Sequence, residues 1–167
     1  MSSFYDRVKE ICSKYKKIAM FIDMDGTIVE YNLYPDGVIT PEAKGLFVNN
    51  KPLKIVLDEL RKINKIENID LYILSMSRSY IIADEKRVWL KKYADFIDEN
   101  NYIIINKEAG DYTTENRNRI KADKIIEKLN QGYEHAIFLD DDHKVLQGAM
   151  KLLGDKCDEF HVSSAII

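Results

Sequence analysis

The sequence predicts an α/β fold built on a doubly wound parallel sheet. Four short apolar runs have the length and composition of buried strands: 18–23, 71–75, 102–106 and 136–142. Segments of helical length and amphipathic pattern separate these runs. Strands that alternate with helices form βαβ units, which place helices on both faces of a parallel sheet. The chain has 167 residues, a length typical of one domain, and we expect a single domain over 1–167.

The expected elements follow this alternation from the first residues to the last. Phe4, Val8, Ile11 and Tyr15 recur at helical spacing and predict an opening helix over 3–16. After it the sequence predicts, in order, a strand over 18–23, a helix over 52–66, a strand over 71–75, a helix over 79–93, a strand over 102–106, a polar loop over 108–118, a helix over 120–129, a strand over 136–142, a helix over 143–153 and a last strand over 159–163. The stretch 30–51 interrupts the first crossover and is rich in turn residues, so we expect a short cap or flap there.

Composition and charge exclude several classes of protein. The net charge is −3, which argues against an extended nucleic-acid groove. No apolar run approaches the roughly 18 residues of a membrane span, and the first residues lack a signal-peptide core, so we expect a cytoplasmic protein that does not enter a membrane. The two cysteines, Cys12 and Cys157, stand too far apart for a zinc motif and are expected to be free thiols.

Polar side chains gather where the predicted strands end. Ligands of open α/β sheets bind beyond the carboxyl ends of the strands. These ends read Asp23-Met24-Asp25-Gly26-Thr27, Ser75-Met76-Ser77, Asn106-Lys107 and Asp140-Asp141-Asp142. Carboxylates that converge on one edge repel one another unless a cation balances them, and an oxygen-only ligand set suits Mg²⁺. The sequence therefore predicts a Mg²⁺ site whose ligands are Asp23, Asp25, Asp140 and Asp141.

The run FIDMDGT resembles the first motif of the haloacid dehalogenase (HAD) superfamily, which consists mostly of phosphatases that act through an aspartyl-phosphate. A serine after the second strand, a lysine near a later helix and an acidic cluster after the fourth strand follow in the family's order, over about 18–154. The resemblance implies a HAD-like, Rossmann-like fold with only a minimal cap insertion. It also implies hydrolysis of phosphate esters, because the family's dehalogenases lack an aspartate at the position of Asp25.

The first motif supplies the reacting groups. A carboxylate attacks a phosphoryl group when a cation removes the repulsion between the two anions. Asp23 stands at the strand tip and is the expected nucleophile; Asp25, two residues on, is the expected general acid and base, and its backbone carbonyl is a further metal ligand. Gly26 permits a sharp turn. Thr27 is a candidate substrate-binding residue, although a hydrogen bond that ties down the loop is the stronger interpretation.

The later strand ends supply groups that bind the phosphoryl oxygens. Ser75 is the expected neutral donor, with Ser77 and Arg78 beside it; Arg78 either grips a second anionic group or is an ordinary surface arginine. Lys121 best matches the family's placement of the catalytic lysine, and Lys107, directly after the third strand, is its rival.

The triple aspartate after the fourth strand divides into three roles. Asp140 is expected to meet the metal, and Asp141 to hold a ligand water or the lysine. Asp142 is expected to cap the helix that begins at His143, because aspartate is favoured at that position.

These features together predict a Mg²⁺-dependent phosphomonoester hydrolase. The segments GLFVNNKPLKIVLDEL, LYILSMS and EKRVWLKKY resemble the 5′(3′)-deoxyribonucleotidase-type branch, which implies a small phosphomonoester such as a nucleotide. The stretch 30–51 is too short to enclose such a substrate, so we expect its base to lie against Tyr31 or Tyr34 and a homodimer partner to help cover the mouth. The alternatives are a phosphorylated macromolecule, either a phosphoprotein or a nucleic-acid end, and a non-enzymatic phospho-accepting or binding module. A phospho-accepting receiver domain carries its acidic pair early in the chain, whereas here the acidic cluster comes late.

Overall fold

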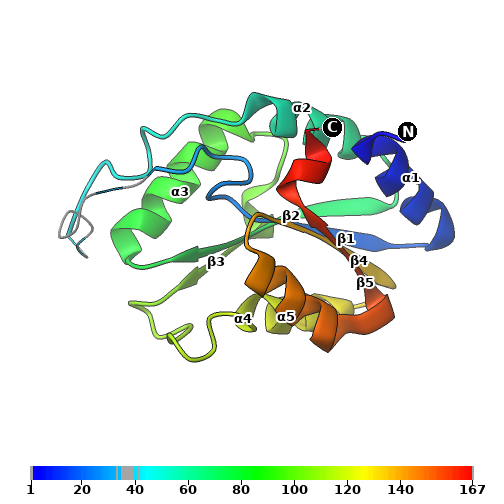
Figure 1. Ribbon diagram of the computed structural model, residues 1–167. Helices are drawn as coiled ribbons and strands as arrows, with labels where there is room; N and C mark the ends of the chain where they lie inside the picture. The colour runs from blue at the N-terminus through cyan, green and yellow to red at the C-terminus, as the bar shows by residue number, and fades with distance from the viewer. Residues whose placement is uncertain (1, 33, 35–39, 41, 167) are drawn as a thin grey trace.

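A five-stranded parallel sheet forms the centre of the computed structural model, which describes residues 2–32, 34, 40 and 42–166. The strand order is β3-β2-β1-β4-β5 (Figure 1). The strands are β1 (Ile18–Ile22), β2 (Ile69–Ser77), β3 (Tyr102–Asn106), β4 (His135–Asp140) and β5 (Cys157–His161). Every neighbouring pair is parallel, so the predicted α/β architecture is confirmed.

Two layers of helices enclose the sheet (Figure 1). The helices of one layer are α1 (Phe4–Lys14), α2 (Lys54–Ile63) and α3 (Tyr80–Tyr93), and those of the other are α4 (Ile120–Leu129) and α5 (His143–Leu153). Short 3₁₀ helices occupy Glu99–Asn101, Gly154–Lys156 and Val162–Ala165. Among the described residues, no helix is both long and apolar enough to cross a membrane.

The side chains of β1 explain why both layers are needed. All five are buried, and they alternate between the two faces. Met20 and Ile22 join the cluster under α1, α2 and α3, whereas Ala19 and Phe21 join the cluster under α4 and α5. A strand that is apolar on both faces folds only where helices cover both.

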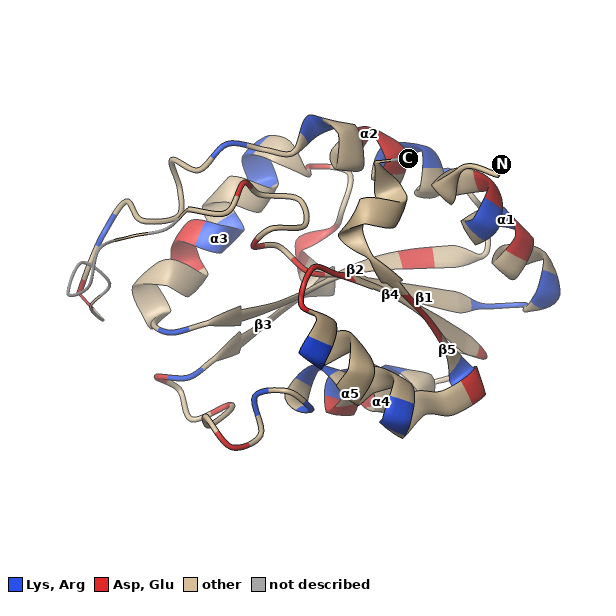
Figure 2. Cartoon of the chain, viewed as in Figure 1, with Lys and Arg blue, Asp and Glu red and all other residues tan. Residues whose placement is uncertain are grey.

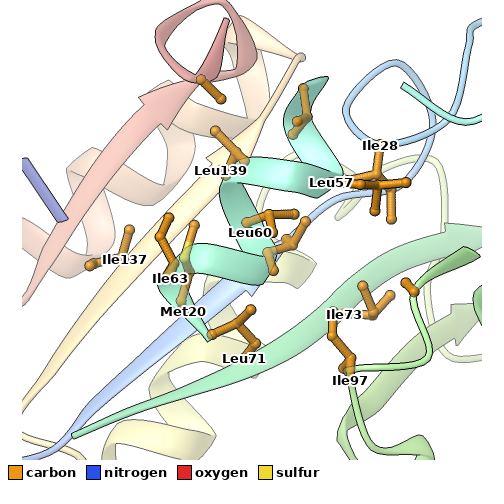
Figure 3. Packing of buried hydrophobic residues seen from close by; sticks show 14 of the residues in the cluster. Met20, Ile28, Leu57, Leu60, Ile63, Leu71, Ile73, Ile97, Ile137 and Leu139 are labelled. Atoms are coloured by element: carbon orange, nitrogen blue, oxygen red, sulfur yellow. The ribbon is translucent and has the colours of Figure 1, made fainter. Parts of the chain in front are cut away.

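Helix α2 shows how the upper layer is held (Figure 3). Leu57, Leu60 and Ile63 lie on one side of the helix, at the spacing of an amphipathic helix, and are buried. They point toward Met20 of β1 and toward aliphatic residues of β2 and β4 (Figure 3). Burial of a side chain of this size contributes about 1.5–3 kcal/mol, so this layer fixes the central strands firmly.

Four strands have bounds that differ from those expected. Strand β1 ends at Ile22 rather than 23, and β4 covers His135–Asp140 rather than 136–142. Strand β2 covers Ile69–Ser77 rather than 71–75, because its first half pairs with β1 and its second half with β3. Ser75 therefore lies inside the strand rather than at its tip. Strand β5 begins at Cys157 rather than 159, because Gly154, with φ +55°, ends α5 and the chain enters the sheet after one short turn.

Candidate active site

The register of the central strands brings Asp23 and Asp140 side by side. Ile22 of β1 pairs with Leu139 of β4, and each aspartate is the next residue of its chain segment. The Asp23 amide donates to the Leu139 carbonyl at 3.0 Å, which continues the ladder by one step. Strands β2 and β3 extend the sheet on one side of β1, and β4 and β5 on the other. The two aspartates thus stand where the winding of the sheet reverses, the usual ligand site of such folds.

Lys121 lies between these two carboxylates. Its Nζ atom donates to Asp23 Oδ1 and to Asp140 Oδ2, each at 2.7 Å. The lysine stands in the first turn of α4 and is almost fully buried. Burial alone would lower the pKa of Lys121, but the carboxylates of Asp23 and Asp140 outweigh it and raise that pKa. Lys107, the rival candidate, is exposed.

Asp141 completes a cluster of three carboxylates. Oxygen atoms of Asp23, Asp140 and Asp141 lie within 4.8 Å of one another. Burial, together with the charges of Asp23 and Asp140, raises the pKa of Asp141 to about 7. Burial likewise raises the pKa of Asp23, against the attraction of Lys121. Burial is the larger cause of both shifts, and the neighbouring carboxylates add to it. Acidic residues also mark the loop that joins β4 to α5 (Figure 2).

Gly26 is needed for Asp141 to approach. Its backbone has φ +73°, a conformation that glycine adopts without strain. A Cβ atom at this position would collide with the carboxylate of Asp141. The turn after Asp25 therefore depends on glycine for two independent reasons.

The donor chemistry fits a magnesium ion. The cluster offers only carboxylate oxygens, which hard divalent cations prefer. Across the whole site, four carboxylates face two ammonium groups: Asp23, Asp25, Asp140 and Asp141 against Lys86 and Lys121. The excess of two negative charges equals the charge of one Mg²⁺. Asp23, Asp140 and Asp141 are the side chains that would hold it. The Asp25 side chain, also predicted as part of the metal site, does not belong to this cluster and turns toward Lys86 instead.

Lys86 is the site residue that the sequence reasoning missed. Its Nζ atom donates to Asp25 Oδ2, Ser75 Oγ and the Met76 carbonyl, each at 2.7 Å. It lies on α3 and is 1% exposed. The signal was its position, because Lys86 falls at helical spacing between Ala83 and Leu90 on the buried side of the helix. A lysine on an apolar stripe needs buried partners.

The remaining predicted residues differ in burial and in hydrogen bonding. Thr27 is buried, and its hydroxyl donates to Asp23 Oδ2 at 3.1 Å, so it ties down the loop that follows Asp23. The Ser77 hydroxyl is buried and donates to the Ser79 carbonyl at 2.7 Å, which shapes the start of α3. Arg78 is exposed. Contact of Ser77 or Arg78 with a substrate stays a prediction.

Asp142 caps α5, as expected from its sequence position. Its carboxylate accepts from the amides of Lys144 and Val145 at the first turn. Its own amide donates to Asp140 Oδ1 at 2.9 Å. The cap therefore also fixes the orientation of the Asp140 carboxylate.

The expected cap stretch is described in part. Residues 33, 35–39 and 41 lie outside the described residues, so its form as a flap stays a prediction. The part over 45–50 is fastened to α3: the Glu85 carboxylate accepts from the amides of Gly45, Phe47 and Val48 at 2.8–3.1 Å. The Trp89 indole donates to the Asn50 carbonyl at 2.9 Å.

The chain is similar in fold to a solved HAD domain. The HAD domain of the effector protein Lem4 from Legionella pneumophila matches with a TM-score of 0.55 and 17% sequence identity, over 87% of this chain and 85% of that chain. The chain thus has the fold of a HAD domain. Neither a protein-family model nor a curated protein matches the sequence. Nothing in these comparisons supports the nucleotidase branch in particular.

Proposed function

We propose that the chain is a Mg²⁺-dependent phosphomonoester hydrolase of the HAD superfamily that acts through an aspartyl-phosphate on Asp23. The observation that carries the proposal is the placement of Lys121, buried between Asp23 and Asp140 at 2.7 Å from each. A buried ammonium group between two carboxylates, beside a third, forms a site for an anionic substrate and a cation together. The shared HAD-domain fold agrees with this reading.

Two steps, each balanced in atoms and charge, complete the reaction. A carboxylate oxygen of Asp23 attacks phosphorus, the bond from phosphorus to the ester oxygen breaks, and Asp25 gives its proton to the leaving oxygen. Water then attacks the phosphorus of the aspartyl-phosphate while Asp25 takes the water proton, the bond from phosphorus to the Asp23 oxygen breaks, and phosphate leaves with the Asp23 carboxylate restored. Lys121 and Ser75 stabilise the negative charge on the phosphoryl oxygens.

The cation would contribute charge neutralisation to the reaction. When bound by Asp23, Asp140 and Asp141, Mg²⁺ supplies positive charge that offsets the repulsion between the nucleophile and the phosphoryl group. The protein's own residues do the remainder. Thr27 holds the second oxygen of Asp23, and Asp142 holds the second oxygen of Asp140, so both carboxylates are oriented before substrate binds.

A small phosphomonoester such as a nucleotide is the proposed substrate. Tyr31 is 66% exposed, so its ring is free to contact a base, whereas the Tyr34 hydroxyl donates to the Leu46 carbonyl and is engaged in the fold. Tyr31→Ala should then raise KM for nucleotides and leave KM for p-nitrophenyl phosphate unchanged. A homodimer partner over the mouth remains part of the proposal, and light scattering in solution tests it.

A phosphatase panel tests the function itself. The purified chain should release phosphate from a nucleoside monophosphate and from p-nitrophenyl phosphate over many turnovers with Mg²⁺, and not with excess chelator. Release from phosphopeptides or from a 5′-phosphorylated oligonucleotide alone would move the substrate to the macromolecular class. One equivalent of bound phosphoryl without turnover would identify a phospho-accepting module and overturn the enzymatic proposal.

A further inference from the structure

We propose, on the basis of the proposed function, that Lys86 is a positioning residue that holds Asp25 and Ser75 in their reactive orientations. Lys86 touches neither the carboxylate cluster of Asp23, Asp140 and Asp141 nor Lys121 through any hydrogen bond of the described residues. It therefore forms a second, separate lysine centre on the other side of the first motif.

The ammonium group of Lys86 is fully engaged. An ammonium has three protons to donate, and Asp25, Ser75 and the Met76 carbonyl accept one each at 2.7 Å. Because all three acceptors lie at hydrogen-bond distance, no proton is left to bind a phosphoryl oxygen. Lys86 thus acts on the reaction through its partners rather than by touching substrate.

The contact with Ser75 directs the hydroxyl proton. The serine oxygen accepts from Lys86, so its own proton must point elsewhere. Among the described residues, the Ser75 hydroxyl donates a hydrogen bond to no other group. Lys86 therefore leaves Ser75 as a donor, the role that binding of a phosphoryl oxygen requires.

The contact with Lys86 holds one carboxylate oxygen of Asp25 and leaves the second oxygen without a hydrogen bond in the described part of the chain. Oδ2 accepts from Lys86, and the Asp25 side chain is 46% exposed. The second oxygen has no hydrogen-bond partner among the described residues and is the one available to pass a proton to and from substrate. A half-exposed aspartate without such a tether would sample several rotamers, and misplacement of a catalytic group by about 1 Å costs on the order of 10²-fold in rate.

The position of Lys86 is itself held by its surroundings. Its ammonium lies over the Phe47 ring, 5.0 Å from the centroid. Phe47 is in turn fastened, because its amide donates to the carboxylate of Glu85, the neighbour of Lys86 on α3. Helix, lysine and the 45–50 stretch thus form one packed unit behind Asp25.

A double-mutant cycle tests this assignment. We measure kcat and KM of p-nitrophenyl phosphate hydrolysis for the wild type, Lys86→Met, Asp25→Asn and the double variant, with Arg87→Met, an exposed neighbour on the same helix, as the control. We expect Lys86→Met to lower kcat about 10²-fold with KM nearly unchanged. In the Asp25→Asn background the same change should lower kcat by less than about threefold, because the group through which Lys86 acts is already lost.

The same factor in both backgrounds would overturn the proposal, because a merely structural lysine weakens each enzyme alike. Ser75→Ala takes the place of Asp25→Asn in a second cycle and should give a smaller non-additivity, because Asp25, the main group through which Lys86 acts, is still present. Where Lys86→Met does not fold, Lys86→Gln, which keeps a hydrogen-bond donor on a shorter stem, enters the cycle in its place. If the wild type shows no turnover, the proposed function is wrong and this inference falls with it. If the wild type is active but the effects of the substitutions are additive, only the inference about Lys86 is wrong.

Discussion

The Lys121 ammonium lies 2.7 Å from the carboxylate of Asp23, although 98 residues separate them in the chain. Asp23 directly follows the last residue of β1, Ile22, and Lys121 is the second residue of α4. Their meeting depends on the sheet order, which puts β4 next to β1 and packs α4 beneath both. The site is thus a product of the fold's topology rather than of one local motif.

Lys121→Met should abolish activity, whereas Lys107→Met should not. Lys121 balances two buried carboxylates, and loss of one partner of a buried ion pair costs about 3–5 kcal/mol of stability. Loss of its charge from the phosphoryl site should lower kcat at least about 10²-fold. Lys107 is exposed, and its replacement should leave kcat within about twofold. Steady-state kinetics and urea unfolding measure both effects; equal activities of the two variants would reject Lys121 as the phosphoryl-binding lysine.

Gly26→Ala should weaken Mg²⁺ binding. The substitution forces a side chain into a turn with φ +73° and into the carboxylate of Asp141. Gly132→Ala is the matched control, because Gly132 also has positive φ, at +110°, but open space around it. Both variants should lose about 1 kcal/mol or more of stability from backbone strain. Only Gly26→Ala should raise the Mg²⁺ dissociation constant in calorimetric titration, and a similar change in the control would remove Asp141 from the account.

The stability of the Mg²⁺-free protein should fall as pH rises from about 4 to about 7. The pKa of Asp141 is raised from 3.8 to about 7, so between these values the folded state holds a proton that the unfolded state releases. Deprotonation then favours unfolding until the folded pKa is passed, and the curve levels off above it. Under the proposed function Mg²⁺ would bind the ionised cluster, so its stabilising effect should be larger at pH 8 than at pH 5.

Thermal unfolding at several pH values, with and without Mg²⁺, measures this effect. Burial also raises the pKa of Glu159 to about 7, which gives a slope of the same sign. Asp141→Asn isolates the Asp141 contribution, because it removes the Asp141 slope and leaves the slopes of Glu159 and of Asp23, whose pKa burial also raises. An unchanged pH dependence in Asp141→Asn would contradict the assignment.

Gly148→Ala should destabilise the protein, although Gly to Ala inside a helix ordinarily stabilises by about 1 kcal/mol. Gly148 lies in α5, where an added Cβ would collide with the backbone carbonyl oxygen of Asn118, in the loop before α4. Overpacking of this kind costs about 1–3 kcal/mol. Gln147→Ala, an exposed change one residue earlier, should alter stability by less than about 0.5 kcal/mol. A higher melting temperature for Gly148→Ala would show that α5 and the loop separate easily.

The fold could be predicted because its elements are strongly periodic. The apolar runs around Ile22 and Phe138 are buried on both faces, and only a parallel sheet with two helical layers accommodates several such runs. The ends of the strands are predicted less well, because they depend on pairing partners that the sequence does not reveal. Ser75 was expected at a strand tip and lies within β2, since β3 pairs with residues on both sides of it.

The sequence also predicts the carboxylates of the candidate metal site, but it does not predict the contacts of Lys86. Asp23 and Asp140 stand directly after strong strand signals, and parallel strands end at a common edge. Lys86 lies on a helix that no local motif links to Asp25, and its role depends on how α3 packs against β2. In the sequence, only a family resemblance distinguishes Lys121 from Lys107, whereas in the structure the packing of α4 gives Lys121 buried partners.

Phosphorylation of Asp23 during turnover tests the central claim most directly. Wild-type enzyme, mixed with p-nitrophenyl phosphate and Mg²⁺ and quenched in acid within the first turnovers, is digested and examined by mass spectrometry. We expect a phosphoryl adduct on the peptide that contains Asp23, more of it in Asp25→Asn, and none in Asp23→Asn, which should retain less than about 1% of wild-type activity. An adduct on another residue, or substantial turnover by a folded Asp23→Asn variant, would contradict the account.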